Sequence, residues 1–361
     1  MARTSRILRV PDGGYSWPEL HDLLLPTLKE GLSALVLGSP GVGKSALAVA
    51  LATDLNLPLT DIRLAQQDPA DLGGIYVPDP DRTELRLLAP AWVRRVCDAP
   101  GFIFLDEINA GVTRLHQSVA YQIVLEHRVG PFQFHPDTVV LAAGNQLSDQ
   151  ALATGLSSAL CNRFVHFELR VDAQAWLQWA QRAGIDPRIL GYVEMRGQRV
   201  LFDRLEGEAA FPSPRSWEMA SRLLRRIPDD QIGQAVAACV GVRAAQEFTS
   251  YLRLYRRLSP SNIICRGRMP SFEGKNAEPS RVHATVVAVA DWTREHADEI
   301  ADKQVPNIVS FLSCDGLDPE LWFLFLKRIW DRPDLVRRLK ALPGFRALGA
   351  ELVGLHAESY R

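Results

Sequence analysis

The chain has 361 residues, of which 47% are hydrophobic and 23% charged, as in a globular protein with two or three structural units. Its formal net charge is −1, which argues against a nucleic-acid partner held mainly through phosphate contacts. No C-x-x-C pair, H-E-x-x-H motif, membrane-length apolar stretch or signal-peptide pattern is present, so we expect a cytoplasmic protein without a disulfide framework, zinc site or membrane segment.

One helix is expected before the first strand. Ser16 has the character of a helix N-cap, and leucines follow it at helical spacing until Gly31, which ends the helix. The apolar run at residues 34–37 then predicts a core strand.

A glycine-rich loop, GSPGVGKS at residues 38–45, stands between that strand and a second predicted helix. The pattern G-x-x-x-x-G-K-[ST] in this context is typical of a phosphate-binding loop. Gly41 and Gly43 let backbone N–H groups turn toward an anion, and the helix N-terminus adds the positive end of its dipole. Lys44 supplies charge for the β- and γ-phosphates, and the Ser45 hydroxyl is a magnesium ligand. The predicted nucleotide-binding residues are Gly38, Ser39, Pro40, Gly41, Val42, Gly43, Lys44, Ser45 and Ala46.

A long connection separates the next two predicted strands. Residues 57–62 predict a strand, and residues 66–90, rich in Asp, Pro and Gly, follow it. A connection of this length is either functional or an insertion with structure of its own. A short helix is expected at residues 92–97.

Two adjacent acids follow the apolar run at residues 102–105, which predicts a buried parallel strand. Ligands bind at the carboxyl ends of such strands. We expect Asp106 to hold Mg²⁺, directly or through water, and Glu107 to orient and deprotonate the attacking water. The alternative is a solvated strand end.

A further polar residue ends the next core strand. A helix at residues 115–126 and a hairpin around Gly130 and Pro131 precede the buried strand at 138–143. Asn145 comes directly after it and can hold the lytic water or the γ-phosphate; an ordinary turn asparagine is the alternative. Arg163 precedes the last strand, at residues 164–169, and read alone is a surface arginine.

From residue 171 onward the pattern changes from alternating strands and helices to helices alone, which marks a domain boundary. Helices are expected at 172–183, 186–195, 214–227 and 229–258, and after a linker at 260–280 they are expected at 281–302, 305–313, 319–330 and 335–342. Arg215 stands at the start of one helix, where a surface salt bridge is the alternative role.

These motifs together resemble those of the AAA+ ATPases, and within them the MoxR family, from about residue 32 to 226. GSPGVGKS resembles Walker A, and FIFLDEIN resembles Walker B. AAGN is similar to the strand that carries sensor 1, at Asn145. SALCNRF is similar to the segment ending in the arginine finger, at Arg163, and PSPRSWE is similar to sensor 2, at Arg215.

The resemblance to MoxR proteins also covers the connecting segments. DPADLGG resembles the insertion by which this clade is recognised, and the hairpin at 126–138 resembles the insertion before sensor 1. Residues 110–113, AGVT, replace the prolines usual after Walker B, and the tail after about residue 260 matches no known pattern. Both differences bear on partner choice, and neither touches the hydrolytic residues.

The resemblance implies a P-loop α/β domain with a parallel sheet at residues 1–170, an all-α lid at 171–259, and a linker with a helical extension at 260–361. It also implies an ATP- and Mg²⁺-dependent homo-oligomer, usually a hexameric ring, in which Arg163 reaches a neighbour's γ-phosphate and Arg215 moves the lid. The expected work is remodelling, maturation or assembly of a protein client, with a von Willebrand factor A domain protein as partner. The alternatives are a motor acting on nucleic acid, which the near-neutral charge disfavours, and a module that uses ATP only to assemble.

Overall fold

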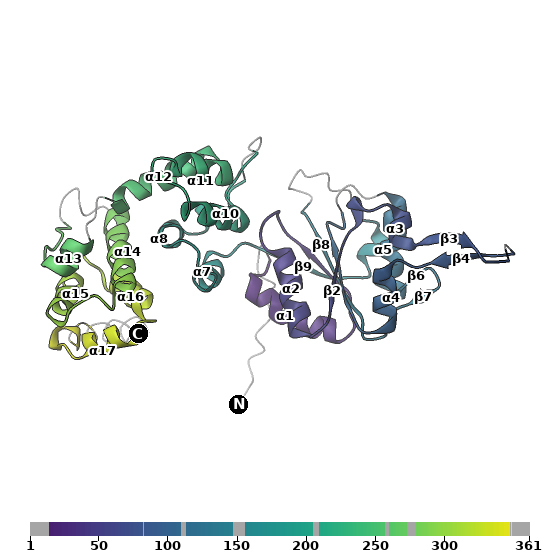
Figure 1. Cartoon of the computed structure of the whole chain (residues 1–361), viewed down its shortest axis with the longest axis horizontal. Helices are drawn as coiled ribbons and strands as arrows, with labels where there is room; N and C mark the ends of the chain where they lie inside the picture. Colours follow the sequence, from purple (N-terminus) through teal and green to yellow (C-terminus); the bar gives the residue numbers. More distant parts are fainter. Residues whose placement is uncertain are drawn as a thin grey trace, which may run out of the picture. The chain divides into compact units, whose positions relative to one another are not determined.

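The computed structural model describes residues 14–81, 83–109, 113–146, 156–204, 209–256, 260–272, 279–346 and 348. The chain forms two compact units, coloured in sequence order in Figure 1. The first unit extends to Trp176 and includes Ser213–Arg215, and the second contains Leu177–Pro212 and Ser216–Arg361. Each is described by itself below.

A five-stranded parallel sheet forms the centre of the first unit, in the order β2-β5-β8-β1-β9. The central strands β5 and β8 are buried along their whole length, as is most of β1, because helices cover both faces of such a sheet. This confirms the predicted α/β fold. The strand bounds are β1 (Ala34–Leu37), β2 (Leu59–Arg63), β5 (Phe102–Asp106), β8 (Val139–Gly144) and β9 (Val165–Glu168).

The helices around the sheet begin and end close to the predicted positions. The first helix has Ser16 as its N-cap, with a capping box to Glu19, and buries Leu20, Leu24 and Leu28. The predicted helix at 115–126 is α-helical only to Tyr121 and continues as a π-helical turn at Gln122–Glu126. The α-helices of this unit outside the insertion are α1 (Trp17–Lys29), α2 (Lys44–Asp54), α4 (Ala91–Asp98), α5 (Arg114–Tyr121) and α6 (Ser158–Cys161).

The long connection after β2 has structure of its own, which was one of the two alternatives expected for it. It contains a 3-10 turn (Leu64–Gln66), α3 (Pro69–Gly73) and an antiparallel hairpin of β3 (Ile75–Pro78) and β4 (Leu85–Leu88), which points away from the sheet in Figure 1. The hairpin predicted around Gly130 and Pro131 is formed by β6 (Arg128–Val129) and β7 (Phe132–Gln133). The two hairpins touch, because a Cβ at Gly130 would lie 2.7 Å from Leu87 Cδ2.

The second unit contains only helices among its described residues, as expected after residue 171. The helices α7 (Ala173–Arg182) and α10 (Pro214–Leu224) begin in the first unit and continue into the second. The remaining helices lie wholly in the second unit: α8 (Pro187–Arg196), α9 (Gln198–Leu201), α11 (Ile232–Val240), α12 (Val242–Arg256), α13 (Pro260–Arg266), α14 (Pro279–Glu295), α15 (Val305–Leu312), α16 (Pro319–Ile329) and α17 (Pro333–Lys340).

Three expectations about these helices were wrong. The single helix expected at 229–258 breaks at Gly241, whose φ of +85° favours glycine and separates α11 from α12. The expected linker begins with the helix α13, whose Ile263 and Ile264 are buried. The helix expected at 281–302 ends at Glu295.

The helices beyond residue 260 have a hydrophobic core of their own, which includes Ile264, Phe311 and Phe325. They are also joined to the preceding helices, because Arg328 of α16 binds both Asp291 of α14 and Glu194 of α8. The division into a lid and an extension therefore stays a prediction. Within the part of the chain that the structure describes, we find no helix with the length and apolar character needed to cross a bilayer.

Candidate functional site

The glycine-rich loop leaves the carboxyl end of β1 in a conformation that requires its glycines. Gly41 and Gly43 have φ values of +81° and +108°, and Gly43 is the N-cap of α2. A Cβ on Gly38 would lie 2.9 Å from the Leu169 carbonyl oxygen, and a Cβ on Gly41 the same distance from Ser213 Oγ. These backbone angles place N–H groups at the start of α2 in the arrangement that binds phosphate. The loop therefore fits a nucleotide.

Lys44 joins the loop to the neighbouring strand β8. Its Nζ donates to the Gly38 carbonyl oxygen at 2.5 Å, to the Ser39 carbonyl oxygen at 3.0 Å and to Asn145 Oδ1 at 3.1 Å. The loop backbone is also tied to β8, since the Gly38 N–H donates to the Gly144 carbonyl oxygen. The structure thus brings the predicted Asn145 to the predicted phosphate-binding lysine.

Ser45 and Asp106, the two predicted magnesium ligands, lie together. Ser45 Oγ donates to Asp106 Oδ2 at 3.2 Å, and Asp106 is 7% exposed at the end of β5. A hydroxyl and a carboxylate are hard oxygen donors of the kind that Mg²⁺ prefers. The described residues hold no group of three or more His, Cys, Asp or Glu side chains suited to a metal. The Ser45 and Asp106 donor pair fits Mg²⁺, which is usually bound through one or two protein groups together with substrate phosphates.

A second carboxylate, that of Asp61, lies on the adjacent strand. Asp61 of β2 is in register with Phe104 of β5. Partial burial, and then the negative charge of Asp106, raise the pKa of Asp61.

Glu107 has a strained backbone. Its φ is +54°, in the left-handed region that non-glycine residues seldom occupy. Its N–H donates to Asp106 Oδ1 at 2.9 Å, and the next N–H, of Ile108, donates to the Ala143 carbonyl oxygen at 2.9 Å. These contacts hold the turn that presents the half-buried Glu107 side chain. Such strain is concentrated at functional sites.

Asn109 is a site residue to which the sequence assigned no role, although it stands in the quoted FIFLDEIN segment. Its side chain is buried, and it binds the backbone of Asn145 twice: the Asn145 N–H donates to Asn109 Oδ1 at 3.0 Å, and Asn109 Nδ2 donates to the Asn145 carbonyl oxygen at 2.8 Å. No local pattern could reveal this contact, since its partner is 36 positions further along the chain. Residues 110–112, where the sequence departs from the MoxR pattern, lie outside the described residues.

Arg163 is not brought to this cluster. It is exposed and precedes β9, whose first residue, Val165, pairs with Ala34 at the start of β1. The loop begins after the other end of β1, so the length of that strand alone separates the two positions by roughly 10 Å. Among the described residues, the Arg163 guanidinium makes no hydrogen bond or ion pair.

Arg215 is near the loop through its backbone. Its N–H donates to the Gly41 carbonyl oxygen at 3.3 Å, and its side chain is exposed. A Cβ on Gly41 would lie 3.5 Å from the Cβ of Arg215. The start of α10 thus packs directly on the glycine-rich loop.

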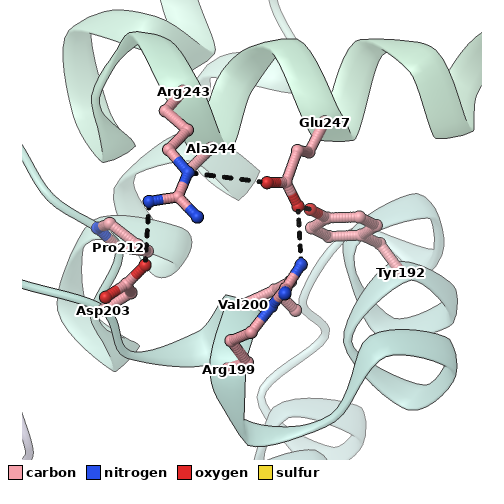
Figure 2. A pocket seen from close by; sticks show the side chains of 8 residues that line it. All are labelled: Tyr192, Arg199, Val200, Asp203, Pro212, Arg243, Ala244 and Glu247. Carbon is pink, nitrogen blue, oxygen red and sulfur yellow. Dashed lines mark hydrogen bonds and ion pairs between the residues drawn. The ribbon is translucent and has the colours of Figure 1, made fainter.

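A pocket in the second unit is a separate feature. Figure 2 shows that its charged side chains point toward one another: Glu247 pairs with Arg199 at 3.6 Å and with Arg243 at 3.8 Å, and Arg243 also pairs with Asp203 at 3.9 Å. Because its charges balance within the pocket, and no predicted nucleotide-binding residue lines it, we do not assign it to the nucleotide site.

Comparison with known proteins agrees with this geometry. Residues 34–169, from β1 to just past β9, match the ATPase family associated with various cellular activities (AAA), so they form an AAA ATPase domain. A point-mutant structure of RuvB from Thermotoga maritima is 15% identical, with 81% of this chain and 86% of that chain covered and a TM-score of 0.39. NtrX from Brucella abortus in complex with ADP is 13% identical, with 78% and 64% covered and a TM-score of 0.39. At these low TM-scores, no inference about this chain rests on the two structures.

Proposed function

We propose that this chain, an ATP hydrolase with an AAA ATPase domain at residues 34–169, is a MoxR-like ring ATPase that remodels a protein client. The observation that carries the proposal is the meeting of Lys44, Ser45, Asp106 and Asn145 at one edge of the sheet. The groups follow three strands, β1, β5 and β8, and Glu107 comes directly after Asp106 with its φ at +54°.

In the proposed site, the loop N–H groups and Lys44 bind the phosphates of ATP. Ser45 and Asp106 would hold Mg²⁺, which neutralises charge on the phosphates when it is bound. Glu107 orients the attacking water and accepts its proton, and the Asn145 amide holds the water or the γ-phosphate. The products are ADP and phosphate.

We propose that Arg163 acts on a neighbouring subunit. Its exposure and its place at the amino end of β9 support this role, because they set it apart from the loop of its own subunit. An arginine supplied in this way contributes about 10³- to 10⁵-fold to phosphoryl-transfer rates. The proposed assembly is a homo-oligomeric ring, a hexamer by resemblance to the family.

Arg215 is proposed to report the nucleotide state to the helical region. It is the second residue of α10, and its N–H binds the Gly41 carbonyl oxygen of the loop, so a shift of Arg215 on binding phosphate would displace the start of that helix. A protein client with a von Willebrand factor A domain is proposed by resemblance, and the cytoplasm is proposed as the location from the sequence pattern. All five cysteines are free, which fits a reducing compartment.

The experiment that tests the proposed function replaces Glu107 by Gln. The variant keeps the side-chain shape and loses the base, so we expect turnover to fall by about 10²- to 10⁴-fold while ATP binding and oligomers persist. In the presence of ATP it should retain a co-expressed von Willebrand factor A domain protein that the wild type releases. Normal turnover would remove Glu107 as the base, and ATPase stimulation by DNA would favour the nucleic-acid motor instead.

A further inference from the structure

We propose that Asn109 is a positioning residue that couples Asn145 to the turn carrying Glu107, so that engagement of the γ-phosphate and placement of the base occur together. This inference rests on the proposed function of Asn145 and Glu107. It adds a residue that the hydrolytic set did not contain.

The contact between Asn109 and Asn145 is closely fitted. A side-chain amide carries one donor and one acceptor group side by side, and here they satisfy the carbonyl and the N–H of the same residue, at 2.8 and 3.0 Å. Asn109 is 5% exposed. A Cβ on Gly144 would lie 2.8 Å from Asn109 Oδ1, so the strand before Asn145 leaves room for this amide only because it carries a glycine there.

The two hydrogen bonds between Asn109 and Asn145 continue the pairing of β5 with β8 beyond the ends of the two strands. The last register pair of β5 and β8 is Leu105 with Ala142. Beyond it, the Ile108 N–H donates to the Ala143 carbonyl oxygen at 2.9 Å, and Asn109 then holds Asn145. The turn after β5 is therefore tied to the end of β8 at successive points.

This arrangement connects the two functional side chains. Asn145 Oδ1 accepts from Lys44 Nζ at 3.1 Å, so the Asn145 side chain already contacts the phosphate-binding group. Glu107 lies between the end of β5 and Ile108, the first residue bound to the end of β8, and its φ is +54°. A displacement of Asn145 toward the γ-phosphate would move Asn109 with it, and the strained turn at Glu107 would have to follow.

A purely structural role for Asn109 is the competing explanation, since a buried amide that satisfies two backbone groups also stabilises a domain. The two roles predict different results when substitutions of Asn109 and Asn145 are combined. A residue that acts through Asn145 has little left to contribute once the Asn145 side chain is gone, whereas an independent structural residue contributes the same amount in either background.

The test is a double-mutant cycle of Asn109→Ala and Asn145→Ala, with kcat measured at saturating ATP. A misplacement of about 1 Å costs about 10²-fold in rate, so we expect each single variant to lose activity on that order and the double variant to match Asn145→Ala alone. Losses that multiply in the double variant would overturn the inference. Asn307→Ala is the matched control, because Asn307 Nδ2 also donates to a backbone carbonyl, of Ile264 at 2.8 Å, in the second unit; it should leave kcat unchanged.

A second variant keeps the inference testable where Asn109→Ala folds poorly. In Asn109→Asp, the carboxylate still accepts from the Asn145 N–H and repels the Asn145 carbonyl oxygen, and protonation restores the missing donor. The activity of this variant relative to wild type should therefore rise as the pH falls, while a ratio that stays flat with pH contradicts the inference. Thermal unfolding of each variant confirms that folded protein is compared.

The two proposals fail in different ways. Full activity of Asn145→Ala would contradict the proposed role of Asn145 itself. Impaired Asn145→Ala together with fully active Asn109→Ala would contradict only the coupling through Asn109.

Discussion

In the first unit, Lys44, Ser45 and Asn145 direct polar atoms toward one partly open edge of the sheet, whereas in the second unit Glu194, Asp291 and Arg328 are closed off from solvent. The side chain of Arg328 is 4% exposed and lies between the two carboxylates, at 2.7 Å from Asp291 Oδ1 and in direct contact with Glu194. Polar and charged side chains thus form two kinds of cluster. In the first, the polar atoms lie beside the glycine-rich loop at partly exposed strand ends; in the second, opposite charges pair with one another away from solvent.

This contrast distinguishes residues that stabilise the fold from residues that are expected to act in nucleotide binding or turnover. Removing a partner from the closed cluster leaves a buried charge unpaired, which is costly to folding. Removing a group from the open edge exposes polar atoms that water can reach, so the loss should be seen in nucleotide binding or turnover. Variants of the cluster in the second unit should therefore change the free energy of unfolding, and variants at the strand ends of the first unit should change nucleotide binding or turnover.

The largest expected effect on stability is that of Arg328→Met. It leaves Glu194 and Asp291 buried without their cation, so we expect unfolding of the second unit to become about 3–5 kcal/mol easier. Arg337→Met is the control, because Arg337 of α17 pairs with Asp334 at 3.2 Å on the surface and its loss should cost at most about 1 kcal/mol. Denaturant unfolding measures both, and equal effects of the two variants would contradict the view of a closed cluster.

A smaller effect is expected from His283 of α14, which neighbours the same cluster. Burial, reinforced by Arg328 and opposed by Glu194, lowers the pKa of His283 to about 4 from its ordinary 6.5. Between these values the unfolded chain binds a proton that the folded chain does not, so His283 makes stability fall as the pH drops from about 6.5 toward 4.

The measurement for His283 is the thermal midpoint of wild type and His283→Gln across that pH range. Burial raises the pKa of Asp291, which Arg328 opposes, but this carboxylate is present in both proteins. The difference between the two curves therefore isolates the histidine. The wild-type midpoint should fall relative to that of His283→Gln as the pH drops, and a constant difference between the two midpoints would refute the role of His283.

The strands of the sheet and the residues at their ends could be predicted from the sequence, because the core strands are continuous apolar runs and the loop has a specific pattern. The strands β3 and β4 were not predicted, since Ile75, Tyr76, Leu85 and Leu88 are exposed and follow no single buried face. The break at Gly241 was missed because one glycine within a helical pattern is often tolerated.

Contacts of residues to which no role had been assigned were beyond the reach of sequence patterns. Asn109 binds a backbone rather than a side chain, so nothing in residue type or spacing marks its partner. Arg328 and Glu194 are 134 positions apart, and each read alone is an ordinary charged residue on a helix. These contacts depend on tertiary packing, which local periodicity does not encode.

The most direct test of the central claim, that the hydrolytic site is completed by a neighbour's Arg163, is the ATPase rate of mixed subunits. Arg163→Ala and Glu107→Gln subunits should each be nearly inactive alone. Mixing them should restore turnover, with a maximum at intermediate ratios, because an intact base then faces an intact arginine. An Arg94→Ala subunit, with an exposed arginine changed elsewhere in the first unit, should stay active alone. Absence of rescue at every ratio would contradict the shared site.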